Sequence, residues 1–437
     1  MKDFAASDDP AVQAQLDRLT ALSLPRGRLG LEVIRELLTR LGDPQKRLPP
    51  VFHVAGTNGK GSTCAFLRAM LEAEGLRVHA ATKPHLVRYN ERIRIAGQLV
   101  ADAELAALLA EVLDAAEGLA PSFFEVTTAA TFLAFARHPA DACIIEVGLG
   151  GRFDATNVME CPAACGIASL GIDHEAFLLA PEEGVPQVPL VRIAFEKAGI
   201  ARPGSPLVTQ TYPQAMALEI ERRAALAGAS LHQRGSNWWA EIGVDSIAYR
   251  DRHGALTLPL PTLPGRHQAD NAALAVAMLR HQDALAVSPA AMAEGIGAAR
   301  WPARLQLLEV GPLTALAPGH EVWLDGGHNA DAGQAIGRHF AGLAGESGRL
   351  HLIIGMLANR DPQAIIAPLG ERLASLTAVP IHGSDAHGPE GYSARAGWAD
   401  SLAEALQALP DDRLPVLIAG SLYLAGQVLK ANGEAPD

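Results

Sequence analysis

One stretch near the start of the chain reads Val51-Phe52-His53-Val54-Ala55-Gly56-Thr57-Asn58-Gly59-Lys60-Gly61-Ser62-Thr63. Its first five residues form an apolar run of strand length. The next segment has helical periodicity and places on one face Phe66, Leu67, Met70 and Leu71. Glycines at such a junction let backbone N–H groups converge, and the helix N-terminus and Lys60 add positive charge. We therefore expect the loop 56–62 to bind phosphate.

The loop departs from the strict phosphate-loop pattern. That pattern would place glycine at Val54, and serine or threonine directly after Lys60, where Gly61 stands. A hydroxyl at Ser62 or Thr63 can still reach a Mg²⁺ ion. The alternative is a glycine-rich turn without a ligand, but three glycines and a lysine at this junction suit phosphate better than packing.

Apolar runs of strand length alternate with amphipathic segments along the rest of the chain. The strand candidates include 51–55, 142–147, 164–170, 206–209, 321–324, 351–355 and 416–419. This alternation indicates parallel sheets with right-handed crossovers. The sequence therefore predicts an α/β fold.

The chain has 437 residues, which favours two domains. The short, turn-rich segment 238–260 predicts a hairpin before a helix at 271–279, and 181–189, with three prolines, predicts a loop. The pattern breaks at Arg300-Trp301-Pro302-Ala303-Arg304, and a second strand–helix series starts near Gln306. We place the domains at 1–300 and 301–437.

Composition excludes several classes of protein. Charged residues make up 19% and hydrophobic residues 49%, as in a compact globular protein. Aromatic residues make up 5% and the net charge is −12, which argues against nucleic-acid binding. No signal-peptide core follows Met1, and no apolar run could span a membrane. Reduced, mostly buried thiols in a cytoplasmic protein are expected at Cys64, Cys143, Cys161 and Cys165.

Further motifs follow the loop in a fixed order. They are Pro84-His85-Leu86, Asn90-Glu91-Arg92-Ile93, Phe123-Phe124-Glu125-Val126-Thr127-Thr128, Glu146-Val147-Gly148-Leu149-Gly150-Gly151-Arg152-Phe153-Asp154-Ala155-Thr156-Asn157, Ile172-Asp173-His174, Glu196-Lys197-Ala198-Gly199-Ile200, Gly265-Arg266-His267-Gln268, Pro302-Ala303-Arg304, Asp325-Gly326-Gly327-His328-Asn329, Gly355-Met356-Leu357 and Gly420-Ser421. With the variant loop, they resemble the Mur-ligase superfamily over nearly the whole chain. Within it they resemble the bacterial dihydrofolate synthase/folylpolyglutamate synthase family.

The resemblance implies a fold and an activity. It implies an N-terminal, mostly parallel sheet flanked by helices, of the Mur-ligase central-domain type, that binds ATP and pteroate. A smaller C-terminal Rossmann-like α/β domain would act as the glutamate-ligase domain. Such ligases transfer the γ-phosphate of ATP to a carboxylate, and the amine of L-glutamate then attacks the acyl phosphate. The acceptor would be dihydropteroate or a folate, and the protein would be a monomer without nucleic-acid or membrane partners.

Two other functions stay open. A Mur ligase acting on a UDP-linked peptidoglycan precursor is disfavoured, because only about 50 residues precede the loop and those enzymes usually begin with a separate substrate domain. A nucleotide-binding protein that has kept the fold and lost catalysis is the alternative from another class.

The resemblance also assigns individual residues. The expected ATP-binding residues are Thr57, Asn58, Gly59, Lys60, Gly61, Ser62, Asn271, Arg304, Asp325 and His328. The expected ligands of Mg²⁺, with two ions implied, are Ser62, Glu146, His174 and a carbamylated Lys197. The catalytic residues would be Lys60, Lys197, His174 and Arg304.

The residues alone leave alternatives for several of these positions. Glu146 ends an apolar strand, where α/β sites form, but a capping or salt-bridged glutamate would also fit. His174 could equally be a loop histidine. Lys197 could form a surface salt bridge with Glu196, and Arg304 an ion pair that stabilises the linker.

The resemblance implies a pteroate pocket formed by Ser122, Phe123, Phe124, Glu125, Phe153, Asp154 and Ala155. A flat pterin favours aromatic stacking, and its amino-pyrimidine edge can donate to a carboxylate or a carbonyl. Core packing is the alternative for Phe123 and Phe124.

One position departs from the family pattern. Two small hydroxyl residues usually precede Pro84-His85, the second a serine that ligates Mg²⁺, whereas here the pair is Thr82-Lys83. A charged lysine has no acceptor atom and cannot replace that ligand. Lys83 could contact ATP phosphate, Thr82 could take over the metal, or activity could be altered.

Overall fold

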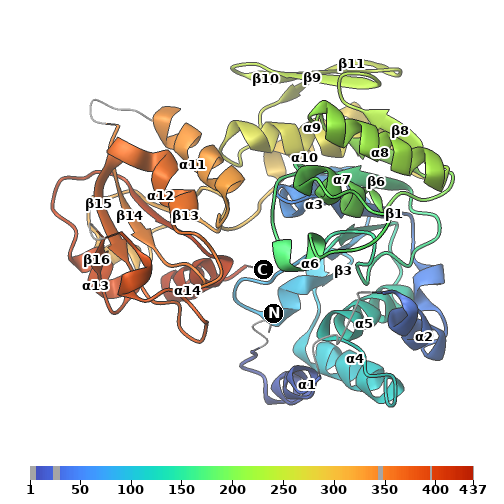
Figure 1. Ribbon diagram of the computed structural model, residues 1–437, viewed down its shortest axis with the longest axis horizontal. Helices are drawn as coiled ribbons and strands as arrows, with labels where there is room; N and C mark the ends of the chain where they lie inside the picture. Colours follow the sequence, from blue (N-terminus) through green and yellow to red (C-terminus); the bar gives the residue numbers. More distant parts are fainter. Residues whose placement is uncertain (1–5, 23–29, 343–347, 394–395, 437) are drawn as a thin grey trace. The chain divides into compact units, whose positions relative to one another are not determined.

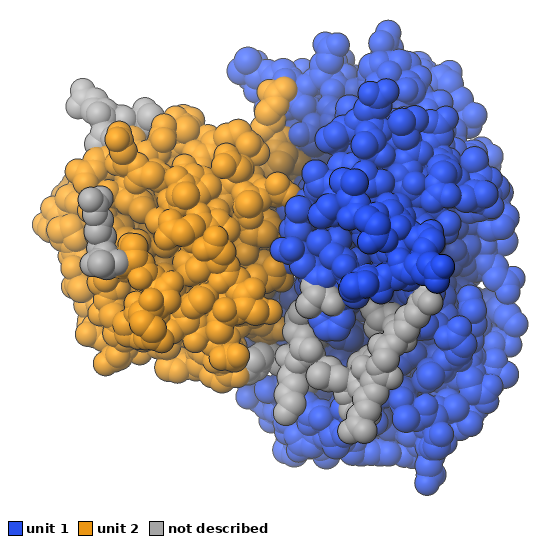
Figure 2. Space-filling model, in the orientation of Figure 1, with its two compact units in different colours: residues 1–262, 269–299, 437 blue, residues 263–268, 300–436 orange. Residues whose placement is uncertain are grey.

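The computed structural model describes residues 6–22, 30–342, 348–393 and 396–436. The chain divides into two compact units, coloured separately in Figure 2. Unit 1 contains Met1–Thr262 and Ala269–Ala299, and unit 2 contains Leu263–Gln268 and Arg300–Pro436. The division falls at Arg300, but the short segment Leu263–Gln268 belongs to unit 2, whereas the sequence analysis assigned it to the first domain.

Unit 1 is built on an eight-stranded sheet with the order β4-β3-β2-β5-β1-β6-β7-β8 (Figure 1). Its strands are β1 (Val51–Ala55), β2 (Val78–Ala81), β3 (Ile93–Ile95), β4 (Gln98–Leu99), β5 (Ala142–Glu146), β6 (Ala164–Ile167), β7 (Pro206–Thr209) and β8 (Ser230–Gln233). In this order, every neighbouring pair between β2 and β8 is parallel. At the other edge, β3 pairs antiparallel with both β2 and β4. The mostly parallel sheet expected from the sequence is therefore confirmed.

Helices flank this sheet. They are α1 (Pro10–Thr20), α2 (Glu32–Arg40), α3 (Lys60–Ala73), α4 (Asp102–Ala115), α5 (Phe123–Arg137), α6 (Glu175–Leu178), α7 (Pro189–Ala198), α8 (Gln214–Ala227), α9 (Arg266–Arg280) and α10 (Pro289–Ala298), with short 3₁₀ turns η1 (Pro44–Arg47) and η2 (Tyr89–Arg92). Helices α1, α2, α4 and α5 gather together (Figure 1), and their apolar faces bury one core against β1, β2 and β5. A second core packs α7 and α8 against β1, β6 and β7.

The segment 238–260 forms three strands, so the predicted hairpin was incomplete. The strands β9 (Trp238–Ile242), β10 (Ser246–Asp251) and β11 (Gly254–Pro259) make a separate antiparallel sheet. The rings of Trp238 and Tyr249 stack with centroids 6.0 Å apart. Arg280, at the end of α9, donates to Asp251 Oδ1 at 2.6 Å, which ties the sheet to that helix.

Unit 2 contains a six-stranded sheet with the order β12-β13-β17-β14-β15-β16, parallel except for the β12–β13 pair. Its strands are β12 (Gln306–Leu307), β13 (Val322–Asp325), β14 (Leu350–Ile354), β15 (Leu373–Ala378), β16 (Gly397–Trp398) and β17 (Val416–Ala419). Its helices are α11 (Ala330–Gly342), α12 (Gln363–Leu369), α13 (Leu402–Gln407) and α14 (Leu422–Asn432), with 3₁₀ turns η3 (Thr314–Leu316), η4 (Gly370–Arg372) and η5 (Pro389–Gly391).

The four cysteines are free thiols, of which only Cys161 is exposed. Within the described ranges, every helix is too short or too polar to cross a membrane.

Candidate active site

The predicted phosphate loop joins β1 to α3. β1 ends at Ala55, and α3 begins at Lys60 directly after Gly59, which has a φ of +82°. The Lys60 ammonium donates to the carbonyl oxygens of Gly56 at 3.0 Å and Thr57 at 3.2 Å. The Lys60 side chain therefore folds back over the loop 56–62, so that its positive charge lies on the same side as the N-terminus of α3.

Asn271, predicted to bind ATP, lies against this loop although it comes from α9. A Cβ atom on Gly59 would lie only 2.4 Å from Asn271 Oδ1. The positive φ and this close approach both require glycine at position 59.

This contact gives a matched pair of substitutions. We expect Gly59→Ala to weaken ATP binding at least tenfold, because a methyl group would displace Asn271 and reshape the loop. Gly75→Ala is the control: Gly75 has a φ of +85° and open space around its Cβ position. It should lower the free energy of unfolding by about 1 kcal/mol, the usual penalty for positive φ, and leave ATP affinity unchanged. Calorimetric titration with ATP distinguishes them, and equal ATP affinities would contradict the assignment.

Thr57 connects the loop to the segment that follows β6. Its backbone N–H donates to Ser169 O at 2.7 Å, and its hydroxyl donates to Gly171 O at 2.8 Å. The loop is therefore fixed to the segment that leads to Asp173 and His174.

Glu146 lies where the sequence predicts a metal ligand. It is the last residue of β5, pairs in register with Val54, and is 3% exposed. Its Oε2 atom accepts a hydrogen bond from the backbone N–H of Lys83 at 3.0 Å. A buried carboxylate thus faces the loop at the carboxyl edge of the sheet, where α/β proteins bind ligands.

Lys83 itself extends along Gly148. A Cβ atom on Gly148 would lie 3.5 Å from Lys83 Cδ, 3.8 Å from Lys83 Nζ and 3.3 Å from Asp154 Oδ2. The ammonium of Lys83 and the carboxylate of Asp154 therefore flank the same glycine. The Lys83 side chain thus points toward predicted site residues. This placement favours a phosphate and metal site that Lys83 alters, rather than a surface lysine with no role in the site.

Lys197 is buried in the last turn of α7, with 4% of its surface exposed. Burial, aided by the charge of Lys60, lowers the pKa of Lys197 to about 7, although Asp173, Asp154 and Glu196 act in the opposite direction. Among the residues that the structure describes, none forms a hydrogen bond or an ion pair with its ammonium. A large fraction of this lysine is therefore the neutral amine at neutral pH.

The alternative of a surface salt bridge between Lys197 and Glu196 is wrong. Glu196 is 4% exposed, and its carboxylate accepts hydrogen bonds from Arg152 at 2.8 and 3.0 Å. The sequence could not show this, because Arg152 is 44 residues away along the chain.

His174 has a left-handed backbone, with a φ of +53°, and precedes α6. Its N–H donates to Asp173 Oδ1 at 2.7 Å, and its Nε2 lies 3.8 Å from Asp173 Oδ2. Asp173 is 8% exposed, and its charge raises the pKa of Lys197. The sequence analysis gave Asp173 no role, although it lies in the motif Ile172-Asp173-His174.

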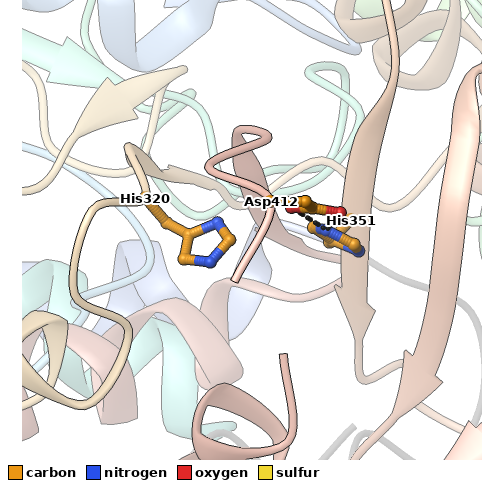
Figure 3. Close-up of side chains that lie close together, drawn as sticks. All are labelled: His320, His351 and Asp412. Carbon is orange, nitrogen blue, oxygen red and sulfur yellow. Dashed lines mark hydrogen bonds and ion pairs between the residues drawn. The ribbon is translucent and has the colours of Figure 1, made fainter. Parts of the chain in front are cut away.

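A group of possible metal ligands lies elsewhere, in unit 2. It comprises His320, His351 and Asp412, at the amino ends of β13, β14 and β17 (Figure 3). The His320 ring nitrogens lie 2.7 and 3.1 Å from the carbonyl oxygens of Leu414 and Pro410, and His351 Nε2 lies 3.1 Å from Asp412 Oδ1. His351 and Asp412 thus contact each other, while His320 contacts backbone carbonyl oxygens, and no predicted metal ligand belongs to the group.

Asp154 is held firmly at the predicted pteroate pocket. Its Oδ2 accepts from Leu149 N at 2.8 Å, and its Oδ1 accepts from Thr156 N at 3.0 Å and from the Thr156 hydroxyl. Thr156 Oγ1 also lies 2.8 Å from His53 Nε2. Burial lowers the pKa of His53, so its ring is neutral and can donate to Thr156. The sequence analysis did not identify His53, which is hidden within β1.

Ser122 and Glu125 form a capping box at the start of α5. Glu125 Oε2 accepts from Ser122 N at 2.8 Å and Ser122 Oγ at 2.7 Å, and Ser122 Oγ accepts from Glu125 N at 3.3 Å. Their polar atoms therefore stabilise the helix end. The same turn presents Phe123, which contacts Tyr89 edge-on at 6.3 Å, and Phe124, which is 37% exposed.

The expected nucleotide-binding residues of unit 2 gather at the carboxyl end of β13. Asp325 ends the strand and accepts from Leu305 N at 2.8 Å and Gly327 N at 2.6 Å. Burial raises the pKa of Asp325, while the charge of Arg304 and these two N–H groups act against that effect. His328 Nδ1 lies 3.0 Å from Gly326 O. The remaining carboxylate lone pairs of Asp325 can accept from hydroxyls.

Known proteins resemble this chain over almost its whole length. It is 34% identical to the dihydrofolate synthase/folylpolyglutamate synthase of Escherichia coli strain K12 over 409 residues, which cover 92% of this chain and 91% of that protein. It is also 34% identical to the Bacillus subtilis protein of the same name over 430 residues, covering 92% and 94%. No family model matches the chain.

Solved structures agree with these sequence relatives. Escherichia coli FolC in complex with DHPP and ADP superposes with a TM-score of 0.84 at 33% identity and covers 97% of both chains. A bifunctional folylpolyglutamate synthase/dihydrofolate synthase with Mn, AMPPNP and L-glutamate bound superposes with a TM-score of 0.82 at 32% identity, covering 97% of this chain and 98% of that one. The chain therefore belongs to the dihydrofolate synthase/folylpolyglutamate synthase family of ATP-dependent ligases, within the Mur-ligase superfamily.

Proposed function

We propose that this ligase joins L-glutamate to the carboxylate of dihydropteroate through an acyl phosphate, and that it extends folates by the same chemistry on a γ-carboxylate. The observation that supports this most strongly is the combination of a phosphate loop at Lys60 with Lys197, a buried lysine whose pKa is lowered to about 7. A free carboxylate is a poor electrophile, and phosphorylation supplies its leaving group. The enzyme then has mainly to position reactants and neutralise charge.

Lys60 and the loop amides would hold the β- and γ-phosphates of ATP. In the structure, the Lys60 ammonium rests on carbonyl oxygens at 3.0 and 3.2 Å, within reach of a phosphate that replaces them. Asn271 would support the loop from α9. Arg304, Asp325 and His328 of unit 2 would also bind ATP, and Asp325 would accept from the ribose hydroxyls.

The residues fit Mg²⁺ as the cation. Glu146 and Ser62 supply buried oxygen atoms and are 3% and 2% exposed. Glu146 ends β5, and Ser62 lies in the first turn of α3, which follows the neighbouring strand β1. Oxygen donors of this kind suit Mg²⁺, and His174 would complete the set. When bound, the cation reduces the negative charge of the phosphates. We propose two such ions, the second supported by Lys197.

Lys197 would act as a carbamate. Its neutral amine can attack CO₂, so that a nitrogen–carbon bond forms and one proton is released to solvent. The product carries two oxygen atoms and a negative charge. It therefore replaces a buried cation beside Lys60 with a group that can bind a metal ion and that Lys60 attracts.

The pterin would stack on the aromatic side chains at the start of α5. Phe124 is exposed enough to do so, and Phe123 orients it, with ring centroids 5.5 Å apart. Asp154, Phe153 and Ala155 would line the other side. Because Ser122 and Glu125 already bond to each other, we assign them to the support of this turn. We further propose that unit 2 binds glutamate and that the protein is a cytoplasmic monomer.

Phosphate release tests this function directly. Purified protein with ATP and Mg²⁺ should release phosphate only when both dihydropteroate and L-glutamate are present, and dihydrofolate should form in equal amount. Tetrahydrofolate in place of dihydropteroate tests the second activity. ATP binding without release in any mixture would instead favour a nucleotide-binding protein that has lost catalysis.

Lys83 provides a separate prediction. We expect Lys83→Ser to lower the Mg²⁺ concentration for half-maximal activity several-fold, because a cation near the site is removed and a hydroxyl ligand added. The measurement is a Mg²⁺ titration of the initial rate. The control is Lys46→Ser, at a lysine whose side chain is 56% exposed. An unchanged titration curve would remove Lys83 from the metal site.

A further inference from the structure

A network of four charged side chains, two buried and two partly buried, joins three segments around the last turns of α7. It consists of Arg152 from the loop after β5, Glu182 from the segment 180–188, and Arg192 and Glu196 from α7. Their side chains are between 5% and 16% exposed. Two cations and two anions make the network neutral as a whole.

Glu182 is the member that attaches the segment 180–188. Its Oε1 accepts from Arg152 Nη1 at 3.0 Å, and its Oε2 accepts from Arg152 Nη2 at 2.6 Å. The same Oε2 accepts from Arg192 Nη2 at 2.8 Å. Such bidentate, charge-assisted bonds are stronger than bonds between neutral groups and also fix the relative orientation of the side chains. The proline-containing segment is therefore fastened onto α7.

Arg152 also connects Glu182 to the last turn of α7, which carries Lys197. Its Nε and Nη2 atoms donate to Glu196 at 3.0 and 2.8 Å, and its backbone N–H donates to Glu196 O at 2.8 Å. A Cβ atom on Gly151 would lie 2.9 Å from both Glu196 O and Lys197 O. The loop after β5 and the end of α7 thus lie in direct contact.

We propose that Glu182 is a positioning residue, which acts through Arg152 and Glu196 to hold the last turn of α7 so that Lys197 stays buried and aligned. This inference rests on the proposed carbamate at Lys197. Without Glu182, two arginines would share one carboxylate in a buried setting, and their rearrangement would release the turn.

The test uses a graded series of variants of the full chain. Glu182→Gln keeps the shape and removes the charge, and Glu182→Asp keeps the charge but is one methylene too short to reach both arginines. Glu183→Gln is the matched control, because Glu183 is exposed in the same segment. Each protein is loaded with ¹³C-bicarbonate, and the loss of the ¹³C label from Lys197 is followed by NMR after dilution into unlabelled buffer.

We expect the label to leave Glu182→Gln at least tenfold faster than the wild type, Glu182→Asp at an intermediate rate, and Glu183→Gln at the wild-type rate. The kcat of Glu182→Gln should fall about tenfold while its KM for ATP changes less than twofold. If Glu182→Gln does not fold, Glu182→Asp carries the test. Equal label loss and equal kcat in Glu182→Asp and the wild type would overturn the inference and leave the proposed function intact. A wild type that takes up no label would overturn the carbamate itself.

Discussion

Replacing Lys60 with alanine should lower kcat/KM for ATP by about 10³-fold, the range in which removal of one preorganised charge lies. Lys60 is the only residue of the loop 56–62 with a full positive charge. Its ammonium rests on two loop carbonyl oxygens, so it needs to move little to meet a phosphate. Steady-state kinetics with ATP as the varied substrate measure the effect.

Lys46→Ala is the control for Lys60→Ala. Lys46 is a lysine of the same unit with a surface ion pair to Asp43 at 3.0 Å, and its loss should leave the kinetics unchanged. A Lys60→Ala enzyme within tenfold of the wild type would mean that the loop does not hold the transferred phosphate.

Lys197→Met should abolish most of the activity and yet stabilise the protein. We expect kcat to fall at least 10²-fold, because methionine cannot carry a carbamate. In CO₂-free buffer at pH 7, the free energy of unfolding should rise by about 1–4 kcal/mol, as when a buried charge is replaced by an apolar side chain of similar size. Chemical denaturation and steady-state kinetics of the same preparation measure both effects.

The stability of the unmodified wild type should also depend on pH with a definite sign. The pKa of Lys197 is lowered from 10.5 to about 7 in the folded protein. Between these values the unfolded chain binds more protons, so the contribution of Lys197 to stability rises with pH from about 7 to 10.5. Below about pH 7, Lys197 is protonated in both the folded and the unfolded chain, so its unfavourable contribution to the free energy of unfolding no longer changes with pH. Lys197→Met should lack this slope, and an identical slope in both proteins would contradict a buried Lys197 with a lowered pKa.

The phosphate loop could be predicted from sequence because its signals are local. Residues 51–55 form β1 and α3 begins at Lys60, since an apolar run, glycines and a helical repeat follow one another directly. The capping box of Ser122 and Glu125 was equally local and readable. The resemblance instead implied that Ser122 and Glu125 line a ligand pocket, and only the structure shows that their side chains bond to each other.

The surroundings of Lys197 could not be predicted in the same way. Arg152 and Glu182 are 30 residues apart, and Arg152 and Glu196 are 44 residues apart. Their network therefore depends on the tertiary fold, which brings these distant segments together. From sequence, Glu196 was the obvious partner of Lys197. In the folded protein both side chains are buried, and Glu196 pairs with arginines instead of with Lys197. These are tertiary effects, which adjacency along the chain does not indicate.

An oxygen-transfer experiment tests the acyl phosphate most directly. Dihydropteroate with ¹⁸O in its carboxylate is incubated with the enzyme, ATP, Mg²⁺ and L-glutamate, and the released phosphate is analysed by mass spectrometry. Attack of the carboxylate on the γ-phosphate followed by amide formation leaves one carboxylate oxygen on phosphate, so each released phosphate should carry one ¹⁸O atom. Released phosphate without ¹⁸O, or label found in AMP, would contradict the proposed ligase mechanism.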